Sequence, residues 1–423
     1  MRSFKLRKQF LANVLQVFRG TAIAQAILLA VTPVLTRLFS PEAFGELVMY
    51  QAILTFGLVG SALRYEYAIL LPDDTKVATD LVLIGLFVSA MISALLLIVA
   101  AVVNWQSVDI APGFSSVLIY VPIALLLGGW AQTLNFLALR EKNFRVTANA
   151  KIARSISLSV ISLTGGSIRA SGSTLMLADV FGKLVALVLL WNQLSDKVIR
   201  HLKDMKWSQL LATAGRYKLF PKVSLPSSMI NTAAFSLTPL MMAANFGLVV
   251  AGLYALVDRV LGAPSALIGT AVGQVYMTEL AEYKRTSPHK ASNLFLKVTM
   301  TQAKLAIIPV VIISIVAPDL FSLVFGEAWR ESGAYVRPLA LLYFLSFVFT
   351  PIGATLTVLE HQKRQLYWDT SRLAAILVAW SVIAWLDLSA LIGLLVFSLT
   401  MSVFIVVYLG LCLLSFKQLE QAT

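Results

Sequence analysis

The sequence predicts an all-α, polytopic membrane protein with about twelve transmembrane helices in two six-helix halves. Of its 423 residues, 58% are hydrophobic and 13% are charged, whereas soluble domains carry about 25% charged residues. Apolar stretches of about 20 residues, each long enough to span a bilayer core as a helix, recur along almost the whole chain. One long polar connection, at residues 195–222, divides these stretches into two sets of six.

Hydropathy along the chain predicts the individual helices. A single helix over residues 373–415 would be about 64 Å long, which is twice the thickness of a bilayer core, so Asp387 marks a turn. The predicted ranges are 11–36, 44–63, 79–103, 116–139, 147–168, 173–194, 223–245, 249–275, 295–317, 334–358, 367–386 and 389–415.

The basic residues predict the orientation of these helices. Arg19 interrupts the first apolar run, so we expect a retained membrane helix there and not a cleaved signal peptide. With the N-terminus in the cytoplasm, 25 Lys and Arg residues lie in or beside cytoplasmic segments, and four lie on the opposite side: Arg37, Arg169, Arg330 and Arg337. Because basic residues gather on the cytoplasmic side of membranes, both termini are expected there. The same asymmetry accounts for most of the net charge of +13, so we expect no nucleic-acid partner.

The polar connection predicts the domain organisation. Residues 1–194 form an N-terminal six-helix lobe, 195–222 a cytoplasmic basic connection, and 223–423 a C-terminal six-helix lobe. A faint repeat links the halves, since residues 33–47 and 239–256 each place a proline near a helix end and a glycine soon after it. Six helices per half keep both halves in the same orientation, as in the parallel repeats of transporters.

Charged residues within the predicted spans are the candidate functional residues. Each lipid-exposed base would cost about 2.5 to 3.5 kcal/mol, so these side chains must face protein or water. Local pairing, for example between Asp179 and Lys183, or snorkelling of Arg154 is one explanation. A surplus of three positive charges favours an anionic ligand instead. The bases are Arg19, Arg154, Lys183, Arg259 and Lys304, and the acids, which are candidates for proton or ion coupling, are Asp179 and Asp258.

Metal and cofactor chemistry has no support in the sequence. The single cysteine, Cys412, lies in an apolar run and excludes a thiolate cluster. The three histidines, His201, His289 and His361, lack a second ligand at metal-binding spacing. We therefore expect neither a metal nor a cofactor.

Five stretches together resemble the bacterial oligosaccharide flippases of the O-antigen (Wzx) type and the related polysaccharide transporters. This family shares the multidrug/oligosaccharidyl-lipid/polysaccharide (MOP) exporter superfamily with MATE antiporters and lipid II flippases. The resemblance covers essentially the whole chain. The stretches are TRLFSPEAFGEL at 36–47, ALRYEYAILLPDD at 62–74, RYKLFPKVSLPSSMIN at 216–231, AGLYALVDRVLGAPSALIGTAVGQVY at 251–276 and FGEAWRESGAYVRPLA at 325–340.

The resemblance implies a MATE-like fold, with two six-helix lobes around a central cavity, and a function. Such flippases move undecaprenyl-pyrophosphate-linked oligosaccharides by alternating access from the cytoplasmic to the periplasmic leaflet of the inner membrane, for O-antigen, capsule or exopolysaccharide biosynthesis. The resemblance assigns substrate contacts to Arg64, Glu66 and Arg259. It also implies a polysaccharide polymerase and a chain-length regulator as partners, besides membrane lipids.

Two other functions are weighed against the flippase. A multidrug or cation antiporter of the same superfamily would favour an acidic or aromatic cavity, whereas the surplus charge here is positive. A membrane enzyme would need a sizeable extramembrane loop with catalytic acids. The only adjacent acid pair, Asp73 and Asp74, lies in a short loop near a helix start, where turn and capping roles are common. We therefore expect a transporter and not an enzyme.

Overall fold

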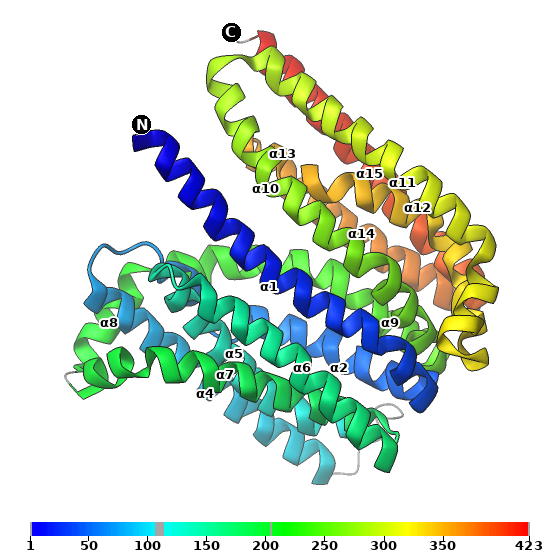
Figure 1. Ribbon diagram of the computed structural model, residues 1–423, viewed down its shortest axis with the longest axis horizontal. Helices are drawn as coiled ribbons and strands as arrows, with labels where there is room; N and C mark the ends of the chain where they lie inside the picture. Colours follow the sequence, from blue (N-terminus) through cyan, green and yellow to red (C-terminus); the bar gives the residue numbers. More distant parts are fainter. Residues whose placement is uncertain (1, 106–113, 204, 422–423) are drawn as a thin grey trace. The chain divides into compact units, whose positions relative to one another are not determined.

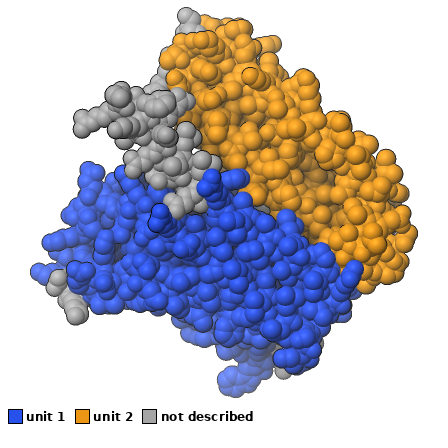
Figure 2. All heavy atoms as spheres, in the orientation of Figure 1, with its two compact units in different colours: residues 1–252 blue, residues 253–423 orange. Residues whose placement is uncertain are grey.

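The computed structural model describes residues 2–105, 114–203 and 205–421, with the side chains of residues 1–17, 114–116, 203, 235, 285 and 288 left outside the description. Helices make up almost all of this part of the chain, and it contains no strand. Residues 1–252 and 253–423 each pack as a compact unit, called unit 1 and unit 2 below (Figure 2). The lobe boundary predicted at residues 195–222 stays a prediction about topology.

Unit 1 contains the first eight helices and most of the ninth (Figure 1). They are α1 (Arg2–Leu38), α2 (Pro41–Gly60), α3 (Tyr65–Ala68), α4 (Thr75–Trp105), α5 (Phe114–Arg140), α6 (Phe144–Ile168), α7 (Gly172–Lys203), α8 (Trp207–Arg216) and α9 (Leu225–Val257), with a π-helical turn, η1 (Phe220–Ser224), before α9.

Unit 2 contains the remaining helices. They are the π-helical turn η2 (Asp258–Gly262), α10 (Ala263–Thr286), α11 (Pro288–Phe325), the 3₁₀ turn η3 (Glu327–Trp329), α12 (Arg330–Ile352), α13 (Thr355–Val358), α14 (Gln362–Trp385) and α15 (Ala390–Gln421).

Twelve helices of 20 or more residues lie in the described part of the chain, and they match the predicted ranges in order. The predicted boundary between the seventh and eighth helices is Gly247, whose φ of 85° and ψ of 172° break α9 into two helical segments. Glycine suits this position because it adopts positive φ without a side-chain clash. Asp387, with φ of 47°, separates α14 from α15 as predicted. The all-α prediction with about twelve long helices is confirmed.

Nine stretches of the described residues are long and apolar enough to cross a membrane, and one of them, 236–284, spans the break at Gly247. The helices α6 and α14 are long but more polar, because each carries charged side chains in its middle. The most apolar surface belongs to α11, where only 11% of the span is buried. Large exposed aliphatic side chains over so many helices identify a multi-pass membrane protein.

Each unit has its own apolar core. In unit 1, α7 packs on α5 and α6, and α4 packs on α5; the core around them includes Leu81, Leu134 and Leu190. In unit 2, α12 packs on α10, α11 and α15, and the core includes Tyr276 and Tyr408. These cores hold the helices that carry the intramembrane charges.

Two turns in different units have the same backbone geometry and support an internal repeat. Lys142 and Glu360 lie 218 residues apart and have positive φ values of 57° and 66°. Each precedes a long helix, α6 or α14, by two residues. Non-glycine residues seldom adopt this conformation, so its recurrence at matching positions is informative. The matching hydrogen bonds are Lys142 N–H to Leu139 O (3.0 Å), Asn143 N–H to Ala138 O (2.9 Å), Glu360 N–H to Thr357 O (3.1 Å) and His361 N–H to Leu356 O (2.8 Å).

A second repeat-related feature lies within unit 1, where α2 meets the segment after Gly247. A Cβ atom on Gly45 would lie 1.9 Å from the Leu248 carbonyl oxygen, and one on Gly252 would lie 1.8 Å from the Pro41 carbonyl oxygen. Both partners are offset by 207 residues, so each contact mirrors the other. Only glycine permits so close an approach of two backbones, and the echo between residues 33–47 and 239–256 therefore marks a real packing motif.

Both π-helical turns have the same cause. The turns η1 and η2 each end two residues before a proline, Pro226 or Pro264. Proline has no N–H and its ring clashes with the carbonyl oxygen four residues earlier, so an α-helical hydrogen bond cannot form there. An i to i+5 bond forms instead, from Leu225 N–H to Phe220 O in η1 and from Ala263 N–H to Asp258 O in η2. Such π turns are frequent at functional sites.

Candidate functional site

The helices of unit 1 bring three predicted residues together around one carboxylate. Asp179 on α7 is buried and accepts a hydrogen bond from the Tyr50 hydroxyl at 2.8 Å. Arg154 on α6 donates to Asp179 Oδ1 through Nη2 at 3.0 Å, and Lys183, one turn along α7, pairs with Asp179 Oδ2. The predicted local pairing of Asp179 with Lys183 is confirmed, and Arg154 joins them from the neighbouring helix.

This cluster carries a surplus positive charge. Two cations share one carboxylate, so the group has a net charge of +1 when all three are ionised. The Lys183 side chain is 5% exposed and that of Asp179 is 2% exposed, whereas Arg154 is 46% exposed. A buried charge is stable only when paired and hydrogen-bonded. Arg154 is therefore the member of the cluster that can reach an additional anion.

Glycines bring the chain close to this cluster. A Cβ on Gly182 would lie 3.1 Å from the Arg154 carbonyl oxygen, so the absence of a side chain lets α6 and α7 approach each other here. Gly128 on α5 leaves room for the Lys183 stem, whose Cδ and Cε would lie 3.5 Å from an added Cβ.

Arg64 and Glu66 form a second group near the start of α3. Glu66 is 0% exposed and accepts from Gln132 Nε2 at 3.1 Å. Arg64 lies 3.8 Å from the same carboxylate and stacks over the Tyr67 ring at 4.5 Å. Leu63 and Arg64 both have positive φ, 49° and 68°, a conformation that costs about 1–3 kcal/mol per residue and clusters at functional sites.

Asp258 and Arg259 lie in the π-helical turn of unit 2. Asp258 is exposed and accepts from the Tyr343 hydroxyl at 3.3 Å, while Arg259 is half-buried. A Cβ on Gly262 would lie 2.6 Å from Asp258 Oδ1, so the missing side chain makes room for the carboxylate against its own helix. The π turn and this glycine together explain how a charged pair fits inside an apolar helix.

The two remaining candidates stand apart from these groups. Arg19 is exposed on α1, next to the place where Gly20 packs closely against Ala148 of α6. Lys304 is exposed on α11 among exposed aliphatic residues such as Ile307 and Ile308. The structure therefore places the candidates in three groups and at two single positions.

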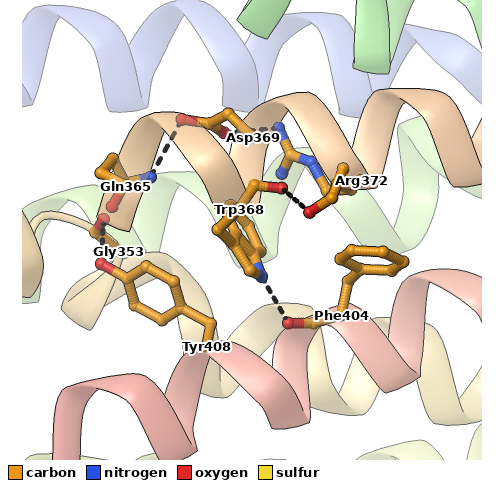
Figure 3. Close-up of polar contacts among 8 residues, drawn as sticks. Gly353, Gln365, Trp368, Asp369, Arg372, Phe404 and Tyr408 are labelled. Carbon is orange, nitrogen blue, oxygen red and sulfur yellow. Dashed lines mark hydrogen bonds and ion pairs between the residues drawn. The ribbon is translucent and has the colours of Figure 1, made fainter. Parts of the chain in front are cut away.

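One intramembrane ion pair was missed by the sequence analysis. Asp369 and Arg372 of α14 lie inside the predicted eleventh helix, and Arg372 Nη2 donates to Asp369 Oδ1 at 3.1 Å (Figure 3). Arg372 is 3% exposed and its guanidinium lies over the Trp368 ring at 4.4 Å. Gln365 donates to the same carboxylate at 3.1 Å. The i, i+3 spacing of an acid and a base within an apolar helix was the available signal.

The described part of the chain contains no cluster of three or more His, Cys, Asp or Glu side chains placed to hold a metal ion. Cys412 is buried.

The fold is similar to that of solved membrane transporters. The lipid II flippase MurJ in an inward closed conformation matches with a TM-score of 0.73 and 9% identity, over 97% of this chain and 90% of that one. An inward-facing MATE family multidrug transporter of the MOP superfamily matches with a TM-score of 0.69 and 13% identity, over 96% of each chain. A MOP superfamily transporter from Pyrococcus furiosus, described as having a binding pocket of reverse polarity, gives 0.57 and 13% over 96% of each. At these identities the likeness shows a shared, MATE-like fold.

Sequence comparison identifies the family. No curated protein sequence matches the chain. The sequence profile of the family described as polysaccharide biosynthesis protein matches residues 34–334, well over half of the chain. This match confirms the resemblance to the polysaccharide transporters that the sequence stretches indicated. The chain belongs to the family of polysaccharide biosynthesis proteins.

Proposed function

We propose that the protein is a flippase that moves undecaprenyl-pyrophosphate-linked oligosaccharide units from the cytoplasmic to the periplasmic leaflet of the bacterial inner membrane. The observation that carries the proposal is the shared carboxylate of unit 1, where Asp179 pairs with both Arg154 and Lys183. One cation of this cluster is in excess. A pyrophosphate supplies the negative charge that such a cluster lacks.

Arg154 and Arg259 are assigned to the pyrophosphate and acidic sugars. Arginine forms bidentate hydrogen bonds with phosphate oxygens, and Arg154 retains an exposed side chain although Asp179 holds one of its nitrogens. Arg259 lies beside the exposed Asp258 in a π turn. Arg64 and Glu66 line the same passage in this proposal, and Arg19 and Lys304 attract the substrate from the single positions where they lie.

Energetics agree with outward movement of an anionic lipid. Transfer of one elementary charge across a membrane potential changes its free energy by about 2.3 kcal/mol per 100 mV. A dianion that leaves a negative interior therefore gains about 4.6 kcal/mol per 100 mV. Coupling to protons or sodium adds to this force and is assigned to Asp179 and Asp258. Both termini lie in the cytoplasm in this proposal, and the product is passed to a polymerase and a chain-length regulator.

The test is transbilayer movement of a fluorescent undecaprenyl-pyrophosphate oligosaccharide in proteoliposomes with an imposed potential. We expect Arg154→Gln and Arg259→Gln to slow movement at least about tenfold, which corresponds to the loss of about 1.4 kcal/mol of binding. Lys363→Gln is the matched control, because Lys363 is exposed at the start of α14, and it should transport at the wild-type rate. Wild-type rates in both arginine variants, or uptake of organic cations in place of the lipid, would overturn the proposal in favour of a multidrug antiporter.

A further inference from the structure

The short helix α8, in the connection between α7 and α9, is held against unit 1 by one face. Leu210 and Thr213 are buried, and Thr213 Oγ1 donates to Asp80 Oδ2 of α4 at 3.1 Å. His201 of α7 bonds the other oxygen of Asp80 at 2.7 Å. The Tyr65 hydroxyl donates to the Ala214 carbonyl oxygen at 3.2 Å. These bonds fix which way the rest of α8 points.

The next face of α8 is apolar and exposed. Trp207 and Leu211 lie one turn apart and are 61% and 70% exposed. Leu219 and Val223, just beyond the helix, are 66% and 61% exposed. Gln209 lies about 160° around the helix from Leu211 and is also exposed, but it belongs to the polar face. Exposed apolar side chains grouped on one face of an amphipathic helix are typical of an interface.

The position of Trp207 shows what lies against this face. Its ring lies 5.5 Å from that of Phe87 on α4. Phe87 begins a row of exposed apolar side chains on one face of that span: Phe87, Met91, Leu95 and Ile98. Because this row faces lipid, Trp207 prolongs the lipid-facing surface at the end of α4 nearest Asp80. Tryptophan is enriched at this depth, where a bilayer meets water.

The charges around α8 favour one kind of lipid. Residues 205–222 contain no Asp or Glu. The exposed basic side chains in this range are Lys206, Arg216, Lys218 and Lys222. Each basic residue near an anionic membrane surface contributes about 1 kcal/mol of attraction.

We propose that α8 lies in the headgroup layer of the membrane as an interfacial anchor, with Trp207 and Leu211 at the acyl boundary and Lys206, Lys218 and Lys222 bound to anionic phospholipid. The hydrogen bonds to Asp80 then hold α4 and α7 at a fixed depth relative to the headgroups. This role concerns the bulk membrane lipid and is separate from the proposed flippase substrate.

The depth of α8 can be measured with a fluorescent label. Leu211→Cys and the matched control Gln209→Cys, each in a Cys412→Ser background, are labelled with nitrobenzoxadiazole and placed in lipid nanodiscs. We expect spin-labelled phospholipid to quench the probe at 211 at least about threefold more than the probe at 209, and soluble iodide to show the reverse order. Both cysteines also serve in the wild-type background, because Cys412 is buried. Equal quenching at the two positions would overturn the anchor.

The lipid preference has its own test. In nanodiscs that contain equal amounts of two lipids, brominated phosphatidylglycerol should quench the probe at 211 more than brominated phosphatidylcholine does. A variant with Lys206→Gln, Lys218→Gln and Lys222→Gln should lose this preference and keep the quenching by both lipids. Equal quenching by the two lipids in the unchanged chain would overturn the anionic assignment, as would a preference that survives in the lysine variant.

Discussion

Arg154 of α6 and Arg372 of α14 occupy matching places in the two units, but their counter-ions differ. Each arginine lies 12 residues after a residue of positive φ, Lys142 or Glu360. Arg154 pairs with Asp179 on the next helix, whereas Arg372 pairs with Asp369 on its own helix. The repeat therefore preserved the backbone and the arginine, and it changed the acid.

This difference separates a movable contact from a fixed one. An ion pair between two helices breaks when those helices shift, and it can exchange its partner for a ligand. A pair at i, i+3 moves with its helix and keeps its geometry. Arg154 is also 46% exposed, while Arg372 is 3% exposed and stacked on Trp368. The comparison assigns responsiveness to the cluster of unit 1 and rigidity to the pair of unit 2.

The largest expected effect comes from removal of the two acids. Asp179→Ala leaves two cations and Tyr50 without their shared partner, so we expect a loss of about 3–5 kcal/mol in the free energy of unfolding. Asp369→Ala removes the partner of one cation that keeps its contact with Trp368, so a loss of about 1–2 kcal/mol is expected. Thermal unfolding in detergent measures both.

Asp319→Ala is the control for these variants. It breaks an ion pair with Arg330 in which the side chains are 79% and 54% exposed, so its effect should stay within about 0.5 kcal/mol. Equal losses for Asp179→Ala and Asp369→Ala would contradict the distinction between the two units.

A smaller effect tests the mirrored backbone crossing. In Gly45→Ala and Gly252→Ala the new methyl group meets a carbonyl oxygen, and overpacking of this kind costs about 1–3 kcal/mol. Because the two contacts are mirror images, we expect similar drops in the thermal midpoint. Gly60→Ala should have little effect, since an added Cβ there meets no atom within 4 Å. A harmless change at one of the first two positions alone would break the repeat relation.

The smallest effect compares the two positive-φ turns. Lys142→Gly relieves backbone strain and should raise the free energy of unfolding by about 0.5 kcal/mol. Glu360→Gly relieves the same strain but loses the 2.7 Å hydrogen bond with Lys284, so it should be less favourable at neutral pH.

Acid should remove the difference between the two turn variants. The hydrogen bond and positive charge of Lys284 lower the pKa of the Glu360 carboxyl. Stability from a carboxyl of lowered pKa is present above its unfolded-state pKa and is lost as pH falls through the folded-state value. Below that value the wild type no longer holds the pair, so Glu360→Gly and Lys142→Gly should give similar increases. A gap that persists in acid would show that the turns are not equivalent.

Much of the fold could be predicted from the sequence because bilayer thickness imposes a length on each apolar run. The twelve ranges, the turn at Asp387 and the pairing of Asp179 with Lys183 all depend on spacing along one chain. The sequence analysis missed the role of Asp369 and Arg372 because polar residues at the start of α14 look like a connection until Trp368 and Tyr408 are seen to bury them.

Contacts between helices needed the structure. Nothing in the spacing of Arg154 and Asp179, 25 residues apart, predicts that α6 and α7 place them 3.0 Å from each other. The π turn at residues 258–262 was equally hidden, because it depends on hydrogen-bond geometry ahead of Pro264. The candidate site was predicted as a set of charges, and its grouping came from packing.

The π turn at Asp258 gives its helix a reserve of one residue. A π-helical turn is an α-helical turn with a single insertion, so deletion of one residue within 258–262 would restore an ordinary turn and leave Tyr276 and Leu280 in their core positions. A helix built this way tolerates a change of length at the place where its charges lie. Relatives of this chain can therefore gain or lose a charged residue here without a change in the rest of unit 2, and a one-residue gap in their alignments is expected at this turn.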